Sequence, residues 1–221
     1  MDTHKVFTLI LVFLVSFLIT SCASKGSAVL QDTNCPVPCW RNIEVGRTGI
    51  ESTIQLLNQM PDVEPGSIRQ GKKPNSLVEV VTASFIDKKE ISLEITFQDE
   101  KVVSIYFSYL DDILLSDAIK KYGEPKYIYP SALKGDPTVY LTVNFLYPDL
   151  GICLHHQNKG LILKLPETYK VNESTNISRI YYVDPSLPQG QIKYGCLSGS
   201  TERELETNKV DWKGFMEYPI P

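Results

Sequence analysis

Strict alternation of apolar and polar residues is the feature that most limits how this chain can fold. Ile91–Phe97 is apolar at every second position, and the same pattern recurs in residues 103–109, 139–145 and 177–183. A period of two gives each strand one apolar face, which is typical of antiparallel sheets with one side buried. Short polar connections such as residues 98–101 predict hairpin turns between the strands.

A helix is predicted ahead of the first strands. Ile50, Ile54 and Leu57 recur at the spacing of one helix face, and Thr48 with Glu51 fits a capping box at the helix start. Together with the alternating strand positions, this face predicts a buried core. The expected core residues are Ile54, Leu57, Leu93, Ile95, Ile105, Phe107, Ile119, Val143 and Phe145.

A second helix is predicted at residues 115–122, with Gly123 as its C-terminal cap. The two helices start about 65 residues apart, and strands follow each of them. The sequence therefore predicts an α+β fold of two tandem units, each a helix followed by an antiparallel meander. The expected organisation is a signal peptide (1–21), a lipidated cysteine with a tether (22–34), a first helix-plus-sheet unit (35–112) and a second helix-plus-sheet unit with a C-terminal tail (113–221).

The N-terminal segment is typical of an exported protein. Lys5 precedes the 14-residue apolar run Val6–Ile19, which is shorter than the roughly 20 apolar residues of a transmembrane helix. The following Ile19-Thr20-Ser21-Cys22 resembles the lipobox of bacterial lipoproteins, which implies cleavage before Cys22 and lipid on its thiol. We expect an exported protein, anchored by this lipid to the cell membrane or outer membrane and facing the extracytoplasmic side. The alternative is an ordinary secreted protein.

Composition narrows the class of partner. The chain has 22 basic and 26 acidic side chains and a formal net charge of −4, which disfavours nucleic acid and anionic lipid surfaces as charge-driven partners. The 12 residues 23–34 are mostly polar and predict a tether that spans at most about 40 Å when extended.

Four cysteines remain after Cys22, namely Cys35, Cys39, Cys153 and Cys196. An even number in an oxidising compartment predicts two disulfides, for which three pairings are possible. Among these, we favour a bridge from one of the N-terminal pair to Cys196. Three residues separate Cys35 from Cys39, a spacing that fits neither a thioredoxin-type redox pair nor the usual half of a zinc site.

Two short motifs carry a family resemblance. Val45-Gly46-Arg47-Thr48 is similar to the Gly-x-Thr segment before the helix of the small outer-membrane assembly lipoproteins and the tandem-repeat β-lactamase-inhibitor-protein-like group. Tyr122-Gly123-Glu124-Pro125 is similar to their Leu-Gly-x-Pro helix exit. Cys35-Pro-Val-Pro-Cys39-Trp40 with Gly46-x-Thr48 also resembles the opening of uncharacterised bacterial lipoproteins. The resemblance implies a non-catalytic envelope protein.

The sequence offers few groups for catalysis or metal binding. His155 and His156 are adjacent, and neighbours on a strand point to opposite faces. Cys153 shares a face with His155, but this pair lacks two of the four ligands of a zinc site. We expect no metal and no cofactor, with one histidine exposed and the other packed at an edge. Gly-x-Ser-x-Gly is absent, and the adjacent acids Asp111 and Asp112 are more typical of solvated partners of a helix dipole.

Aromatic residues gather in the second half of the sequence. Tyr127, Tyr129, Tyr140 and Tyr147 are the candidates for a recognition surface, since amphipathic aromatics are favoured at interfaces. The alternative is that they cover a thin core. Trp40 and Trp212 are expected to be buried near the two ends of the body.

These observations predict a non-catalytic binding or scaffolding module of the cell envelope. Its expected partners are the membrane, through the lipid, and another envelope protein or a wall polymer. The alternative is a cell-wall hydrolase that uses paired carboxylates. A concave site with convergent acids would favour the hydrolase, whereas a flat aromatic surface would favour the binding module.

Overall fold

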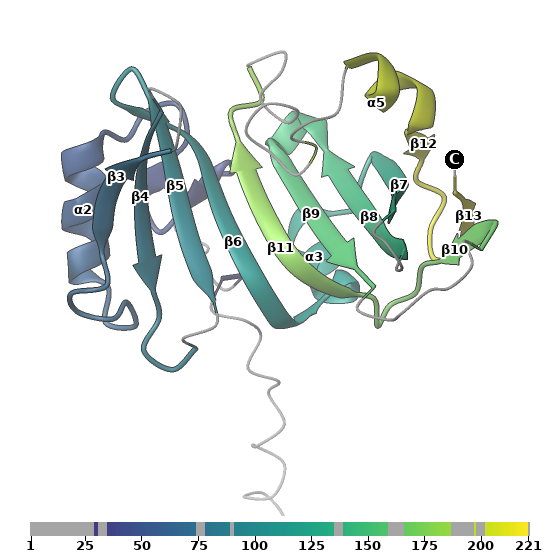
Figure 1. The fold of residues 1–221 in the computed structure, drawn as a ribbon, viewed down its shortest axis with the longest axis horizontal. Coiled ribbons are helices and arrows are strands. Elements are labelled where there is room, and N and C mark those ends of the chain that lie inside the picture. The colour runs from purple at the N-terminus through teal and green to yellow at the C-terminus, as the bar shows by residue number, and fades with distance from the viewer. Residues whose placement is uncertain are drawn as a thin grey trace, which may run out of the picture.

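The fold is built on one large antiparallel sheet. The computed structural model describes residues 29–30, 35–73, 78–88, 91–134, 139–158, 166–186, 197 and 202–220. Nine strands of this part form the sheet in the order β12-β7-β8-β9-β11-β6-β5-β4-β3, and two small two-stranded sheets, β1-β2 and β10-β13, accompany it (Figure 1).

The elements follow one another along the chain with short connections. The helices are α2 (Ile50–Gln59), α3 (Leu115–Tyr122), α5 (Glu202–Asn208) and the 3-10 turn η1 (Pro148–Leu150). The strands are β1 (Cys39–Trp40), β2 (Ile43–Glu44), β3 (Arg69–Lys72), β4 (Glu79–Ser84), β5 (Ser92–Gln98), β6 (Lys101–Leu114), β7 (Tyr127–Lys134), β8 (Val139–Tyr147), β9 (Ile152–Gln157), β10 (Thr168–Lys170), β11 (Asn176–Val183), β12 (Val210–Asp211) and β13 (Glu217–Pro219).

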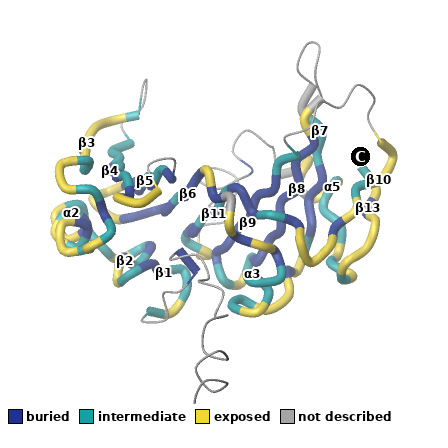
Figure 2. The backbone as a smooth tube through the Cα atoms, turned by 90° about the horizontal axis from the view of Figure 1, so that it is seen from below, coloured by how far each residue is buried: buried dark blue, intermediate teal, exposed yellow. Residues whose placement is uncertain are grey.

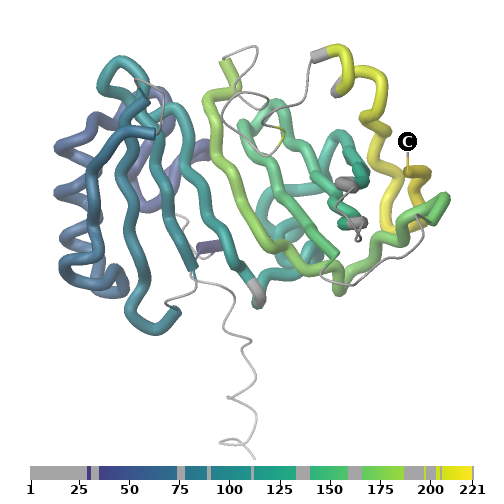
Figure 3. Tube along the Cα trace, in the orientation of Figure 1, coloured from purple at the N-terminus to yellow at the C-terminus, as the bar shows by residue number. Residues whose placement is uncertain are grey.

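The prediction of an α+β fold made of two tandem helix-plus-meander units is wrong. β11 pairs with β6 from Ile177 opposite Ile113 to Val183 opposite Ser104, and it pairs with β9 on its other side. Strands distant in sequence therefore lie side by side, as the teal and yellow-green tubes of Figure 3 show. Alternation tells which face of a strand is buried, but both edges of a strand offer the same backbone donors and acceptors, so it does not identify the neighbour.

The apolar core lies on one side of this sheet. Figure 2 shows α2, α3 and the β1–β2 hairpin on the same side of the strands. Leu57 of α2 and Ala118 of α3 are fully buried there. Seven of the expected core residues are buried, while Ile54 and Ile119 are partly buried and pack against the same cluster. The predicted core is confirmed, as one continuous cluster.

The helix ends are only partly as predicted. Gly123 caps α3 with φ 82°, and its N–H donates to the Ile119 carbonyl, which confirms the cap. The capping box of α2 is wrong, because Gly49 is the N-cap and has no side-chain hydrogen bond. The Thr48 hydroxyl instead accepts from the Glu44 N–H at 2.8 Å and stabilises the turn that precedes the helix.

The first described residues pack onto the body. Val29 and Leu30 fall within the segment expected to be a tether, yet their side chains are 3% and 8% exposed and belong to the core cluster. The Lys121 ammonium donates to the Leu30 carbonyl at 2.5 Å. Trp40 is 1% exposed, which confirms its predicted burial, and Trp212 is half-buried against the core. Within the described residues, no helix has the length and apolar character that crossing a membrane requires.

Candidate functional site

Polar side chains occupy one part of the sheet on the side opposite the main core, beside the small apolar cluster of Tyr129, Leu146, Cys153 and Leu197 against which Tyr181 packs. Strand register aligns them in two neighbouring rows across β4, β5, β6 and β11, and successive residues of a strand alternate between the two sides. The first row is Thr82, Glu94, Tyr106 and Tyr181, and the second row is Ser84, Ser92, Ser108 and Arg179. We call these eight residues the polar face.

Two tyrosines of the polar face lie on β6 and β11, the neighbouring strands near the middle of the nine-stranded sheet. The rings of Tyr106 and Tyr181 are stacked, with centroids 4.5 Å apart and planes inclined by 24°. Burial raises the pKa of the Tyr181 hydroxyl, and the neighbouring Tyr106 adds to that rise. The Tyr181 phenol is therefore neutral at pH 7, and a tyrosine hydroxyl can both donate and accept a hydrogen bond.

Charges of opposite sign flank the tyrosines. Glu94 lies opposite Tyr106 on β5 and forms an ion pair with Lys73 at 2.8 Å. Arg179 lies two residues before Tyr181 on β11, and its Nη2 donates to Gln157 Oε1 at 3.4 Å. Thr82, Ser84, Ser92 and Ser108 occupy the remaining four positions with small side chains, so the rings and charges are the largest groups of the polar face.

The second row continues into a buried histidine. His155 lies opposite Arg179 on one side and Asn144 on the other. Its Nδ1 donates to Asn144 Oδ1 at 2.7 Å, which leaves Nε2 as an acceptor, and Nε2 is buried without a hydrogen-bond partner. Burial lowers the pKa of His155 to about 3, with further lowering by Arg179 and His156. The ring is neutral at pH 7 and too weak a base for proton abstraction there.

The prediction of one exposed histidine is wrong, because both are buried. His155 is 7% and His156 is 8% exposed. His156 points to the core side, where its Nδ1 donates to the Asn176 carbonyl at 2.7 Å and its ring lies 5.6 Å from that of Tyr169. Among the residues that the structure describes, no group of three His, Cys, Asp or Glu side chains could hold a metal ion.

The cysteines pair differently from the predicted arrangement. Cys35 and Cys39 form a disulfide with each other, so neither bridges to Cys196 as expected. Cys153 is also disulfide-bonded and is therefore excluded as a ligand beside His155. Cys196, the remaining candidate, and Cys22 lie outside the described residues.

The four tyrosines of the predicted recognition surface do not come together as one surface. Tyr147 is 3% exposed and belongs to the core cluster, whereas Tyr129 is 6% exposed and packs with Leu146, Cys153 and Leu197 on the other side of the sheet. Tyr127 is partly buried against that second cluster, and Tyr140 is 39% exposed near the other end of β8.

Asp111 and Asp112 are the adjacent acids that the sequence offers to a carboxylate hydrolase. Asp112 forms an ion pair with Lys88, and the side chain of Asp111 lies outside the described part. Hydrogen bonds from Arg41 hold the pKa of Asp62 below its usual value, against an opposing contribution from burial. A general acid needs a raised pKa, so Asp62 is poorly suited to that role.

Sequence reasoning missed Glu94, Tyr106, Arg179 and Tyr181. The alternation that identified Ile105 and Phe107 as core residues also places Tyr106 on the opposite side, so this signal was present within β6. Their assembly into rows required the pairing of β11 with β6, which no local pattern contains. Comparison of the chain with models of protein families, with curated proteins and with solved structures found no match.

Proposed function

We propose that this protein is a non-catalytic binding module of the cell envelope, anchored by lipid on Cys22 and exposed on the extracytoplasmic side. Its polar face would bind another envelope protein or a wall polymer. The observation that carries this proposal is the stacked pair Tyr106 and Tyr181 at the centre of a sheet face, flanked by Glu94 and Arg179.

The physical chemistry of these side chains suits recognition. Tyrosine offers a large amphipathic surface with only two side-chain torsions, so little conformational entropy is lost on binding. Serine and threonine around the rings leave room for a partner to reach them. The carboxylate of Glu94 and the guanidinium of Arg179 make the charge distribution of the surface asymmetric, which favours one orientation of a bound partner. The strands hold all these groups in place before binding.

The proposal is tested by crosslinking and pull-down from native envelopes. The double variant Tyr106→Ala/Tyr181→Ala should reduce capture of a specific partner at least about tenfold, the loss typical of central aromatic residues. Tyr109→Ala is the matched control, because Tyr109 is 66% exposed and is not part of the polar face. Unchanged capture by the double variant would overturn the proposal.

A hydrolase panel run beside the pull-down separates the two classes of function. Cell-wall glycans and peptides serve as substrates, and each variant is checked for a folded state. Turnover that a single Asp or Glu substitution abolishes, without loss of folding, would replace the binding module by the carboxylate hydrolase. Asp62 and Asp112 are each held in an ion pair, which stabilises the ionised carboxylate and does not suit the general acid of a hydrolase. This favours the binding module.

A further inference from the structure

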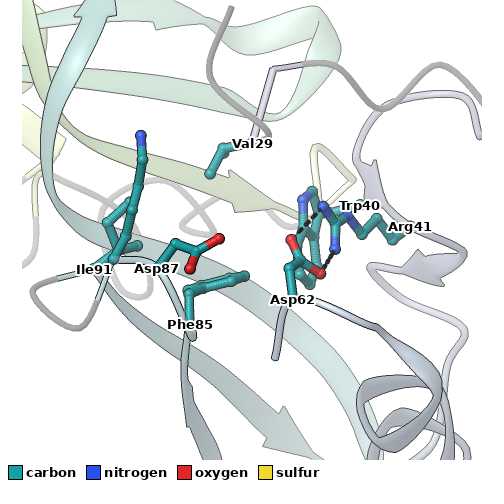
Figure 4. A pocket seen from close by; sticks show the side chains of 8 residues that line it. Val29, Trp40, Arg41, Asp62, Phe85, Asp87 and Ile91 are labelled. Atoms are coloured by element: carbon teal, nitrogen blue, oxygen red, sulfur yellow. Dashed lines mark hydrogen bonds and ion pairs between the residues drawn. The ribbon is translucent and has the colours of Figure 1, made fainter. Parts of the chain in front are cut away.

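The first described residues join the body at one end of the sheet. Val29 is 3% exposed and lines a pocket with three residues from the connection between β4 and β5, namely Phe85, Asp87 and Ile91 (Figure 4). Phe85 and Ile91 are buried in the same core cluster as Val29. The segment that begins at Cys22 therefore reaches the body at a fixed point beside this connection.

Three large apolar side chains are exposed near this point. Ile86 lies in the connection itself, Tyr109 lies in the second half of β6, and Leu114 is the last residue of β6. They are 43%, 66% and 37% exposed, and we call these three residues the apolar tip. Single exposed apolar side chains need no explanation, whereas several at one end of a sheet indicate an interaction surface.

Strand register places the apolar tip at one end of the sheet. The second row of the polar face crosses β4, β5 and β6, and β4 and β6 run in the same direction because both are antiparallel to β5. Ile86 follows β4 beyond this row, and Tyr109 and Leu114 lie beyond it on β6, toward the lower ends of these strands in Figure 1. An ion pair between Lys88 and Asp112 joins the two segments.

Tyr109 is held outward by an irregularity in β6. The register between β6 and β11 shifts at this point, because Ser108 pairs with Arg179 whereas Ile113 pairs with Ile177. The φ of Tyr109 is 61°, a backbone conformation that residues other than glycine rarely adopt. Strain of this kind is found at functional sites. A large amphipathic side chain such as tyrosine suits the boundary between water and lipid.

We propose that the apolar tip lies on the surface of the lipid bilayer. This inference rests on the Cys22 anchor of the proposed function. Seven chain steps from Cys22 to Val29 span at most about 25 Å, so the end of the sheet that carries the apolar tip is the end nearest the bilayer. The opposite end, at the β5–β6 turn, lies about 20 Å farther away, the length of the seven residues of β5. Because the anchor keeps lipid within reach, the contact needs little affinity of its own.

The contact is apolar, because charge does not attract this end to anionic lipid. Residues 86–91 carry two basic and two acidic side chains, and residues 109–114 carry two acidic ones. A lipid surface without net charge is therefore a sufficient partner. With the strand ends on the bilayer, both faces of the sheet point sideways, so the polar face stays accessible to its own partner.

The test measures whether the apolar tip reaches lipid in the full chain. Protein purified from membranes with its lipid is reconstituted into vesicles of dibrominated phosphatidylcholine, whose bromine atoms quench tryptophan fluorescence in the bilayer. Tyr109→Trp adds a tryptophan at the apolar tip, and Lys101→Trp is the matched control at the exposed other end of β6. The emission of wild type, from Trp40 and Trp212, is measured separately and subtracted.

Brominated lipid should quench about half of the emission that Tyr109→Trp adds, measured against the same vesicles without bromine, because an interfacial side chain lies close to the acyl chains. Lys101→Trp should be quenched at least about threefold less. The triple variant Tyr109→Trp/Ile86→Ser/Leu114→Ser should be quenched at least about twofold less than Tyr109→Trp, because it exposes less apolar area to the lipid.

Equal quenching of Tyr109→Trp and Lys101→Trp in vesicle-bound protein, or quenching of neither, would overturn the proposal. Anchored protein without quenching would leave the apolar tip as a contact for another protein. Sedimentation with the vesicles separates this failure from a failure of the anchor, because wild type that does not sediment overturns both the anchor and the contact. Capture of a partner by the polar face, measured with Tyr106→Ala/Tyr181→Ala, does not depend on the quenching result.

Discussion

Arg41 and Asp62 form a two-pronged ion pair, with Nη1–Oδ1 and Nη2–Oδ2 distances of 2.5 and 2.8 Å. The guanidinium also lies over the Trp40 ring, 5.0 Å from its centre. The pair therefore connects the hairpin that follows the Cys35–Cys39 disulfide to the loop after α2. A parallel pair of charge-assisted hydrogen bonds on half-buried side chains is stronger than an ordinary surface ion pair.

Asp62→Asn should lower the free energy of unfolding by about 1 kcal/mol at pH 7, a value that allows for partial solvent screening. The lowered pKa of Asp62 in the folded state sets the pH dependence. The ionised Asp62 carboxylate contributes its full share to the free energy of unfolding above the pKa of the unfolded chain, near 3.8. This share is lost as the pH falls through the lower pKa of the folded protein. Denaturant titrations at pH 7 and pH 2.5 measure the difference, with Asp99→Asn as control. An equal difference in unfolding free energy between wild type and Asp62→Asn at pH 7 and pH 2.5 would contradict a stabilising role of the ionised Asp62.

Phe107 is the second stability probe. Its ring is fully buried and packs edge-on against Trp40 at 4.9 Å and against Tyr182 at 6.3 Å. Phe107→Ala should cost about 3 to 5 kcal/mol of unfolding free energy. Phe215→Ala, at a phenylalanine that is 41% exposed, should cost less than about 1 kcal/mol. Equal losses in the two variants, measured by urea unfolding, would contradict the assignment of Phe107 to the core.

Local patterns predicted α2, α3 and the alternating strands β5, β6, β8 and β11, because the causes of these elements are local. Apolar spacing and the conformational freedom of Gly123 depend on neighbours in sequence, and α3 accordingly spans Leu115–Tyr122 as predicted. Pairing of β11 with β6 joins two segments that are more than 60 residues apart in sequence, Asn176–Val183 and Ser104–Leu114. No run of residues within β11 records that pairing.

The contrast between local patterns and long-range strand pairing also explains which parts of the candidate site the sequence predicts. The predicted recognition surface of Tyr127, Tyr129, Tyr140 and Tyr147 rests on their closeness in sequence, yet Tyr147 has the same alternation position on β8 as the core residue Phe145. That alternation was visible and would have removed Tyr147 from the group. The polar face instead combines residues of β4, β5 and β6 with residues of β11, so its assembly follows from the pairing of β11 with β6 and could not be predicted from local patterns.

Gly151 marks a close approach between two strands. Its φ is +62°, and a Cβ atom there would lie 2.1 Å from the Val183 carbonyl oxygen. Gly151→Ala should cost about 3 kcal/mol or more, since the left-handed backbone adds 1 to 2 kcal/mol to a clash with backbone. Gly66→Ala is the matched control, because Gly66 has φ +76° and nothing within 4 Å of the added carbon. Similar thermal unfolding of both variants would show that the predicted clash is absent.

We predict a Cys153–Cys196 disulfide in the exported protein. Cys153 is disulfide-bonded, Cys35 is joined to Cys39, and Cys22 is the expected lipid carrier. Leu197, the neighbour of Cys196, is 3% exposed and packs with Cys153. Mass spectrometry of peptides cleaved without reductant, after alkylation of free thiols, should detect the two cross-linked pairs and no free thiol among these four cysteines. Alkylated Cys196 in wild type would refute the pairing.

Lipidation at Cys22 is the prediction on which the proposed location depends. Lys5, the apolar run and Ile19-Thr20-Ser21-Cys22 together predict it, and the burial of Val29 adds a spatial consequence. Seven chain steps between Cys22 and Val29 span at most about 25 Å, so the body would stay close to the membrane. Metabolic labelling with a palmitate analogue should mark wild type and Cys35→Ser, while Cys22→Ser should lose the label and its membrane association. Unchanged labelling of Cys22→Ser, or an unlabelled wild type, would contradict lipidation at Cys22 and with it the proposed membrane anchor.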